Sequence, residues 1–317
     1  MVRRPLAPFA CSFLALALCG TVHAADIPSA TPEIFAPGAI SGPSGVDCLT
    51  FAPDGATVYF DQQAGWNGFI LESHRVGNGW SAPQIAPFSG QWQDHDPAMA
   101  PDGSFLVYTS NRADTAGGPA LHGGHLWRVD RRGDGWGAPV RLPDAVNDAT
   151  SIYAPSVAAN GDVYYQRRDD ATHEFHLYHT AWRDGRYQPP QRLALGDPAA
   201  HELDPAIAPD QSFIVFDANY AGKDKPDRLY IAFRAGGGWS EPVDLGDAVN
   251  RYEPWGSHLD PDARTLYFTS NYTAKTSYPR SPAQARADLA RMRAWDNGNN
   301  HIWRVSLAPW LDARRAP

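Results

Sequence analysis

Short segments in which apolar and polar residues alternate recur along the chain, and each leads through a tight turn into a strongly apolar run. In "PAMAPDGSFLVYTS" (97–110), proline fixes one backbone angle and glycine accepts a positive φ, so "PDG" predicts a turn between two strands. The run "FLVY" has the β-branched and aromatic character of a buried strand. Related segments are "FAPDGATVYF" (51–60), "SVAANGDVYY" (156–165), "AIAPDQSFIVF" (206–216) and "HLDPDARTLYF" (258–268). Five copies of one hairpin predict a repeat architecture.

A second segment follows each of the first four hairpins. In "HLWRVDRRGDGWGAPVRL" (125–142) a strand leads through a glycine-rich turn and an aromatic residue into a short strand that carries proline. Proline is tolerated on an edge strand, so this short strand is predicted to be the outermost of its unit. The aromatic residues at the shared position are Trp80, Trp136, Tyr187 and Trp239. We interpret them as packing residues between units rather than as a surface for ligand stacking.

Four antiparallel strands in each unit predict an all-β fold, a five-bladed β-propeller. The last copy lacks its fourth strand, and "TPEIFAPGAIS" (31–41) resembles the outer strand "EPVDLGDAVN" (241–250), so the N-terminal strand is expected to complete the last blade. A degenerate sixth blade is the alternative. The expected single domain covers 25–310, with blades at about 45–92, 93–149, 150–199, 200–250 and 251–307, and a tail at 311–317.

The first 24 residues have the pattern of a signal peptide, with Arg3 and Arg4 ahead of an apolar run and "VHA" before a cleavage site after Ala24. We therefore expect a periplasmic or secreted protein without membrane insertion. The net charge is −8, and loss of two arginines with the leader takes it to −10. An acidic chain without a basic run is a poor candidate for binding nucleic acid. Cys48 is the one cysteine beyond the leader, so no intramolecular disulfide is expected.

At this point the segments "DPAMAPDGSFLVYTSNR" (96–112) and "ELDPAIAPDQSFIVFDANY" (202–220) resemble the WD40-like repeat, called PD40, of TolB-type periplasmic propellers. The resemblance covers nearly all of 31–307. It implies the propeller fold and a periplasmic location. It does not imply one function, because a single fold hosts many.

Chain direction sorts the loops into two faces. The short "PDG" and "GDGW" turns share one face, while the longer loops and the starts of the innermost strands share the other, which we call the mouth face. The ligand-binding candidates on the mouth face are His95, Arg112, Tyr153, Arg168, His201, Asn219, Trp255, His258 and Asn271. The catalytic candidates are Asp47, Asp96, Glu202 and Glu253. Asp96 and Asp204 recur in "DP" pairs, which is also typical of a carboxylate that caps neighbouring backbone N–H groups.

This set of carboxylates, histidines, amides and aromatic residues suits a polar small ligand. The leading hypothesis is a binding or interaction module for such a ligand, a saccharide for example, or for an envelope protein. The alternative is a carbohydrate-active hydrolase or lyase with a carboxylate acid and base. No cofactor is predicted; a divalent metal would require His95, His201 and His258 to converge, and no local spacing supports such a site.

The insertion "SPAQARADLARMRAWDNGNN" (281–300) predicts a helix in the last blade. Ser281 can cap it and Pro282 suits its first turn. The expected apolar face contains Ala285, Leu289, Met292 and Trp295. This face would pack on the side of the propeller, or the helix would form a lid beside the channel.

Overall fold

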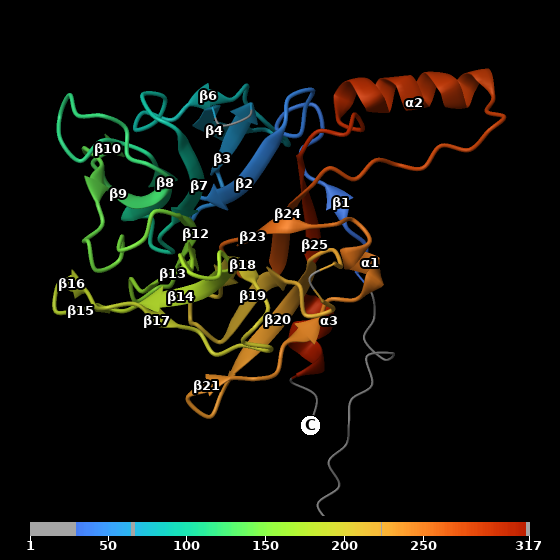
Figure 1. Ribbon diagram of the computed structural model, residues 1–317. Helices are drawn as coiled ribbons and strands as arrows, with labels where there is room; N and C mark the ends of the chain where they lie inside the picture. Colours follow the sequence, from blue (N-terminus) through green and yellow to red (C-terminus); the bar gives the residue numbers. More distant parts are fainter. Residues whose placement is uncertain (1–29, 65–66, 223, 315–317) are drawn as a thin grey trace, which may run out of the picture.

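The chain forms five antiparallel sheets arranged as blades around a central channel, so the predicted five-bladed propeller is confirmed (Figure 1). The computed structural model describes residues 30–64, 67–222 and 224–314. The expected signal peptide and its cleavage site after Ala24 lie outside the described residues.

The elements follow the repeat. The first blade contains β2 (Val46–Phe51), β3 (Thr57–Ala64), β4 (Asn67–Val76), β5 (Gly79–Trp80) and β6 (Gln84–Ile85). The second contains β7 (Asp94–Met99), β8 (Phe105–Ser110), β9 (His125–Arg132), β10 (Gly135–Trp136) and β11 (Val140–Arg141). The third contains β12 (Ile152–Val157), β13 (Val163–Arg168), β14 (Phe175–Thr180), β15 (Trp182–Arg183), β16 (Arg186–Tyr187) and β17 (Gln191–Arg192). The fourth contains β18 (Glu202–Ile207), β19 (Phe213–Ala218), β20 (Arg228–Ala235), β21 (Gly238–Trp239) and β22 (Val243–Asp244).

The fifth blade joins the two ends of the chain. It contains β23 (Trp255–Leu259), β24 (Thr265–Ser270) and β25 (His301–Ser306), and its outer strand is β1 (Glu33–Ile34). Glu33 lies opposite Arg304, and the Arg304 Nε donates to the Glu33 carboxylate at 2.8 Å. The innermost strands β2, β7, β12, β18 and β23 contact one another in a closed ring. The expected closing strand is therefore present, and the alternative of a sixth blade is wrong because the ring has no gap.

All five turns between the first and second strands use the same side-chain bond. In the first blade the Ala56 N–H donates to Asp54 Oδ1 at 2.8 Å, and the equivalent bond in the second blade joins Ser104 N–H to Asp102. The third, fourth and fifth turns use Asn160, Asp210 and Asp262 as acceptors. Each of these bonds joins residues of the same turn. The turns therefore depend on local sequence alone, which explains why the sequence predicted them correctly.

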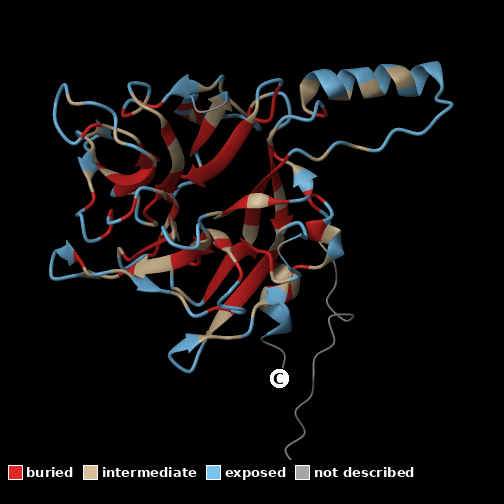
Figure 2. Cartoon of the chain, viewed as in Figure 1, coloured by how far each residue is buried: buried red, intermediate tan, exposed pale blue. Residues whose placement is uncertain are grey.

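The second strands of the second and fourth blades are buried along their whole length, because neighbouring blades cover them on both sides (Figure 2). All six residues of β8 and of β19 are buried. The aromatic residues after the glycine-rich turns pack as expected: Trp136 lies edge-on to Phe88 and Tyr59, with ring centroids 5.4 and 6.0 Å apart. Arg131 covers the same Trp136 ring at 4.4 Å. The aromatic residues at this shared position therefore pack between blades and do not line a ligand site.

Two helices near the C-terminal end differ from expectation. The predicted helix is α2 (Pro282–Ala294), with Ser281 and Gln284 forming a capping box. It projects away from the ring and has no buried side chain, so its expected packing on the propeller is wrong (Figures 1 and 2). Only Trp295, just beyond its end, reaches the core, edge-on to Trp303 at 5.4 Å.

The sequence predicted a tail from residue 311 onward. Residues 311–313 instead belong to a helix, α3 (Ala308–Ala313), whose Trp310 is buried. A third, one-turn helix, α1 (Asp247–Asn250), precedes the fifth blade. Within the described residues, none of the helices has both the length and the apolar character that a bilayer span requires.

Candidate functional site

Each innermost strand is interrupted by a β-bulge at the same place. The register shifts after Asp47, His95, Tyr153, Leu203 and Trp255, which are equivalent positions in the five blades. The residue after each of these has a positive φ: 33° at Cys48, 52° at Asp96, 50° at Ala154, 48° at Asp204 and 62° at Gly256. Four of the five are not glycine, so their positive φ is a strained conformation, and the surrounding contacts must stabilise it. A bulge re-aims side chains and strengthens the local twist, which places these residues at the channel.

The two "DP" aspartates connect neighbouring blades at these bulges. Asp96 Oδ2 accepts a hydrogen bond of 3.0 Å from the Ala154 N–H of the next blade, and Thr109 donates to the same oxygen. Asp204 Oδ2 accepts one of 2.9 Å from the Gly256 N–H. The two residues thus bond backbone N–H groups as the capping interpretation expected, but the groups belong to the next blade rather than to a local turn.

A pocket of about 540 Å³ opens on the mouth face between the second and third blades. Three of the predicted residues line it, namely His95, Asp96 and Tyr153, and Asp204 lies at its inner end. Neutral polar side chains complete much of the wall. These are Gln63, Gln93, Thr109, Ser110, Asn111, Ser151 and Gln166. The loop after β8 closes one side, and Gly124 lets it approach, because a Cβ there would lie 2.4 Å from the Tyr153 ring.

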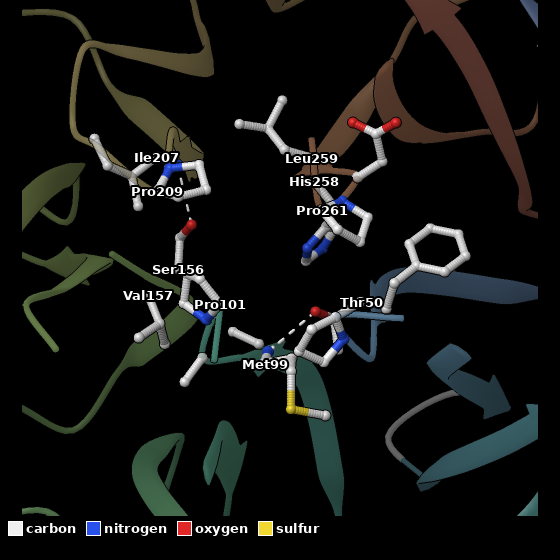
Figure 3. A pocket seen from close by; sticks show the side chains of 15 residues that line it. Thr50, Met99, Pro101, Ser156, Val157, Ile207, Pro209, His258, Leu259 and Pro261 are labelled. Atoms are coloured by element: carbon white, nitrogen blue, oxygen red, sulfur yellow. Dashed lines mark hydrogen bonds between the residues drawn. The ribbon is translucent and has the colours of Figure 1, made fainter. Parts of the chain in front are cut away.

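The turns between the first and second strands surround the opposite end of the channel. A cavity of about 70 Å³ lies there, lined by the prolines of the "PD" turns and by His258 (Figure 3). Side-chain hydroxyls join the blades at this level: Thr50 accepts from the Met99 N–H and Ser156 from the Ile207 N–H, both at 3.0 Å. Burial lowers the pKa of His258 to about 4. At neutral pH the His258 ring is therefore uncharged. The sequence predicted His258 on the mouth face, but it lies at the opposite end of the channel.

Buried carboxyl groups surround the middle of the channel. Burial raises the pKa of Asp47 to about 8, and the charge of Asp61 adds to this effect. Burial, followed by the charge of Asp96, raises the pKa of Asp204 to about 7. Asp61 Oδ2 lies 3.6 Å from His95 Nδ1. Burial lowers the pKa of His95, but the interaction of its ring with Asp61 and the charges of Asp61, Asp96 and Asp94 together offset this effect, so the pKa of His95 is raised.

The raised pKa of Asp47 has a consequence for stability. Above about pH 4 the carboxyl ionises in the unfolded chain, while the folded chain keeps its proton until about pH 8. Its contribution to stability is therefore greatest at acid pH and falls as the pH rises from about 4 to about 8.

We expect Asp47→Asn to raise the free energy of unfolding by about 1–3 kcal/mol at pH 8.5 and to change it little at pH 4.5. Thermal melts across this pH range measure the difference between variant and wild type. Asp134→Asn, an exposed aspartate on the opposite face, is the control. A pH-independent difference for Asp47→Asn would contradict the assignment of a raised pKa.

Several predicted residues are held in structural contacts outside the pocket. Glu202 is 1 % exposed and its Oε1 accepts a hydrogen bond of 2.7 Å from the Tyr220 hydroxyl. Burial raises the pKa of Glu202, which does not line the pocket. His201 Nε2 lies 2.7 Å from Asp227 Oδ1, and this hydrogen bond raises the pKa of His201. Asn219 is buried and accepts from the His201 N–H.

The remaining predicted residues also lie outside the pocket wall. Arg112 donates to the Phe88 carbonyl at 3.0 Å. Glu253 is exposed and Trp255 is partly buried in the fifth blade. Arg168 is the last residue of the second strand of its blade and Asn271 follows the second strand of the fifth blade, and neither lines the pocket.

The three candidate metal-binding histidines, His95, His201 and His258, do not meet. His95 lines the pocket, His201 pairs with Asp227, and His258 lies at the other end of the channel. No group of three or more His, Cys, Asp or Glu side chains within the described part of the chain is arranged to hold a metal ion.

Sequence reasoning missed the polar residues of the second strands. Asp61, Thr109, Gln166, Asp217 and Thr269 lie opposite the residues that precede the five bulges. They face the channel, and Thr109 and Gln166 line the pocket. The available signal was a polar residue at the same place near the end of each apolar strand, as in "VYFDQ" (58–62) and "IVFDAN" (214–219).

Solved structures share this architecture. A proposed TolB from Agrobacterium tumefaciens aligns with 78 % of this chain and 80 % of its own, at 18 % identity and a TM-score of 0.50. This chain is similar to it in fold. A thermostable family-43 glycoside hydrolase aligns with 84 % of this chain and 91 % of its own, at 11 % identity and a TM-score of 0.53. A second glycoside hydrolase aligns with 87 % of this chain and 92 % of its own, at 12 % identity and a TM-score of 0.50.

A scan against protein-family models and a search of curated proteins give no match. At these identities the structural similarities concern the fold alone. They include a TolB-like propeller and glycoside hydrolases, so they favour neither the binding module nor the enzyme.

Proposed function

We propose that this protein is a periplasmic or secreted binding module that takes a polar small ligand, a saccharide for example, in the pocket of the mouth face. The pocket of about 540 Å³ carries this proposal. Its size suits a small oligosaccharide, and its wall combines amides and hydroxyls with the Tyr153 ring. Such a wall offers both donors and acceptors to sugar hydroxyls, and an aromatic face to the ring of a sugar.

The experiment measures the binding of neutral oligosaccharides by thermal shift and by calorimetry. Tyr153→Ala should weaken binding roughly tenfold or more, because it removes the aromatic surface from the pocket. Trp255→Ala is the matched control, because Trp255 holds the equivalent strand position in another blade and lies outside the pocket. Equal losses in the two variants, or no binding of any oligosaccharide, would count against this location and ligand class.

The alternative, a carbohydrate-active enzyme, is favoured by one observation. Asp96 and Asp204 line the same pocket, and the pKa of Asp204 is raised to about 7 by burial and by the charge of Asp96. Glycoside hydrolysis uses two carboxyl groups, one of which donates a proton, and a raised pKa suits that donor. Release of reducing ends that Asp96→Asn and Asp204→Asn both abolish, with folding retained, would establish this activity.

A further inference from the structure

The pocket on the mouth face has an unbalanced charge. Asp96 and Asp204 contribute carboxylates to its wall, and no lysine or arginine lines it among the described residues. The other polar groups of the wall are amides, hydroxyls and the imidazoles of His95 and His122. The wall therefore presents a negative potential without a fixed guanidinium or ammonium group to balance it.

Three more carboxyl groups lie around the channel behind this wall, and burial raises the pKa of each of them. Asp47 is 6 % exposed, and Asp61 and Asp217 are fully buried. Asp61 and Asp217 hold the same place in the second strand as Thr109 and Gln166, which line the pocket. The five-fold repeat therefore directs their side chains at the channel beneath the pocket.

These buried carboxylates have unused acceptor atoms. Asp47 Oδ1 and Asp61 Oδ1 lack a hydrogen-bond partner among the described residues, and the side-chain partner of Asp217 is another carboxyl group, that of Asp204. Buried polar groups are nearly always paired, and an unpaired carboxylate oxygen is costly. A donor that enters from the pocket would satisfy them.

The arrangement suits an organic cation better than a metal ion. The carboxylates come from β2, β3, β7, β18 and β19 around the channel, and no three of them converge on one point. A metal ion needs several oxygens at one short distance. An ammonium group instead has three donors that can bond separate oxygens, and the pocket of about 540 Å³ has room for the rest of a small molecule.

We propose that the ligand of the mouth pocket carries a protonated amine, whose ammonium group lies over the channel carboxylates while its neutral part contacts Tyr153 and the amides of the wall. This inference rests on the proposed function, since it names the ligand class for the same pocket. Charge-assisted hydrogen bonds from the ammonium to the carboxylates would supply the selectivity.

The test compares two glycosides of one disaccharide that differ in a single group, a 2-aminoethyl and a 2-hydroxyethyl aglycone. Calorimetry at pH 8 and low salt measures both, because more of the channel carboxyls are ionised there and screening is weak. The aminoethyl glycoside should bind roughly ten- to hundredfold more tightly, as expected for a charge-assisted hydrogen bond.

Asp61→Asn and Asp217→Asn should each reduce this preference by roughly three- to tenfold, because each lowers the affinity for the aminoethyl glycoside more than that for the hydroxyethyl glycoside. Asp134→Asn makes the same substitution at an exposed position on the opposite face and should have no effect. The two test residues lie in different blades, so either variant is sufficient if the other does not fold.

The outcomes separate this inference from the proposed function. Equal affinity for the two glycosides would overturn the amine preference and leave the saccharide pocket standing. Binding of neither glycoside, nor of any other saccharide, would overturn both. A stabilisation by Ca²⁺ alone that Asp61→Asn and Asp217→Asn abolish would identify the cluster as a metal site and overturn the inference.

Discussion

Replacing Trp310 with alanine should lower the free energy of unfolding by about 3–5 kcal/mol. Trp310 is 4 % exposed and belongs to the core shared by the fourth and fifth blades, with Leu266, Val305 and Leu307. Its helix, α3, is held in place by Arg264, which donates to the Asp312 carboxylate at 3.1 Å. Truncation to alanine leaves a large cavity that a packed core cannot fill by relaxation.

Urea titration and thermal melts measure this change, and at about 2–4 °C for each kcal/mol the melting temperature should fall by roughly 10 °C. Met292→Ala in α2 is the control, because Met292 is 52 % exposed and should change stability by less than about 0.5 kcal/mol. Similar effects of the two substitutions would show that α3 does not pack on the propeller in solution.

The second large effect is expected at Asn147, which joins the linker between blades to the third strand of the second blade. Its Oδ1 accepts from the Leu126 N–H at 2.8 Å, and its Nδ2 donates to the carbonyls of Leu126 and Leu142 at 3.1 and 2.9 Å. Asn147→Ala leaves the buried Leu126 N–H without a partner and removes two further bonds. We expect a loss of about 3 kcal/mol or more, because a buried unpaired donor alone costs roughly 1–3 kcal/mol.

Denaturant unfolding again measures the loss, with the exposed Asn78→Ala in the turn between β4 and β5 as control. Asn250 makes the equivalent bonds to Leu229 in the fourth blade, so Asn250→Ala should have a similar effect. If Asn147→Ala were as mild as Asn78→Ala, the assigned hydrogen bonds would not contribute to stability.

Local chemistry explains which parts of the site the sequence could predict. The sequence predicted the mouth face and the pocket residues His95, Asp96 and Tyr153, because these residues precede or form a bulge that recurs in every blade. It did not predict that Asp61 and Asp217 face the same channel, since one polar residue in one apolar strand does not show where it points; only its recurrence at the same place in every blade does so. It also could not predict that Tyr220 bonds Glu202, because the two residues belong to different elements.

The sequence by itself determined the hairpins, their turns and the number of blades, since alternation and turn chemistry act over a few residues and each copy supported the others. It also determined the closure of the ring by the N-terminal strand. Only the tertiary structure decided which polar residues meet, because the channel is built from side chains of five blades that are far apart in the chain. The same holds for α2 and Trp310: a helix can be predicted from its own residues, but what it packs against depends on the assembled ring.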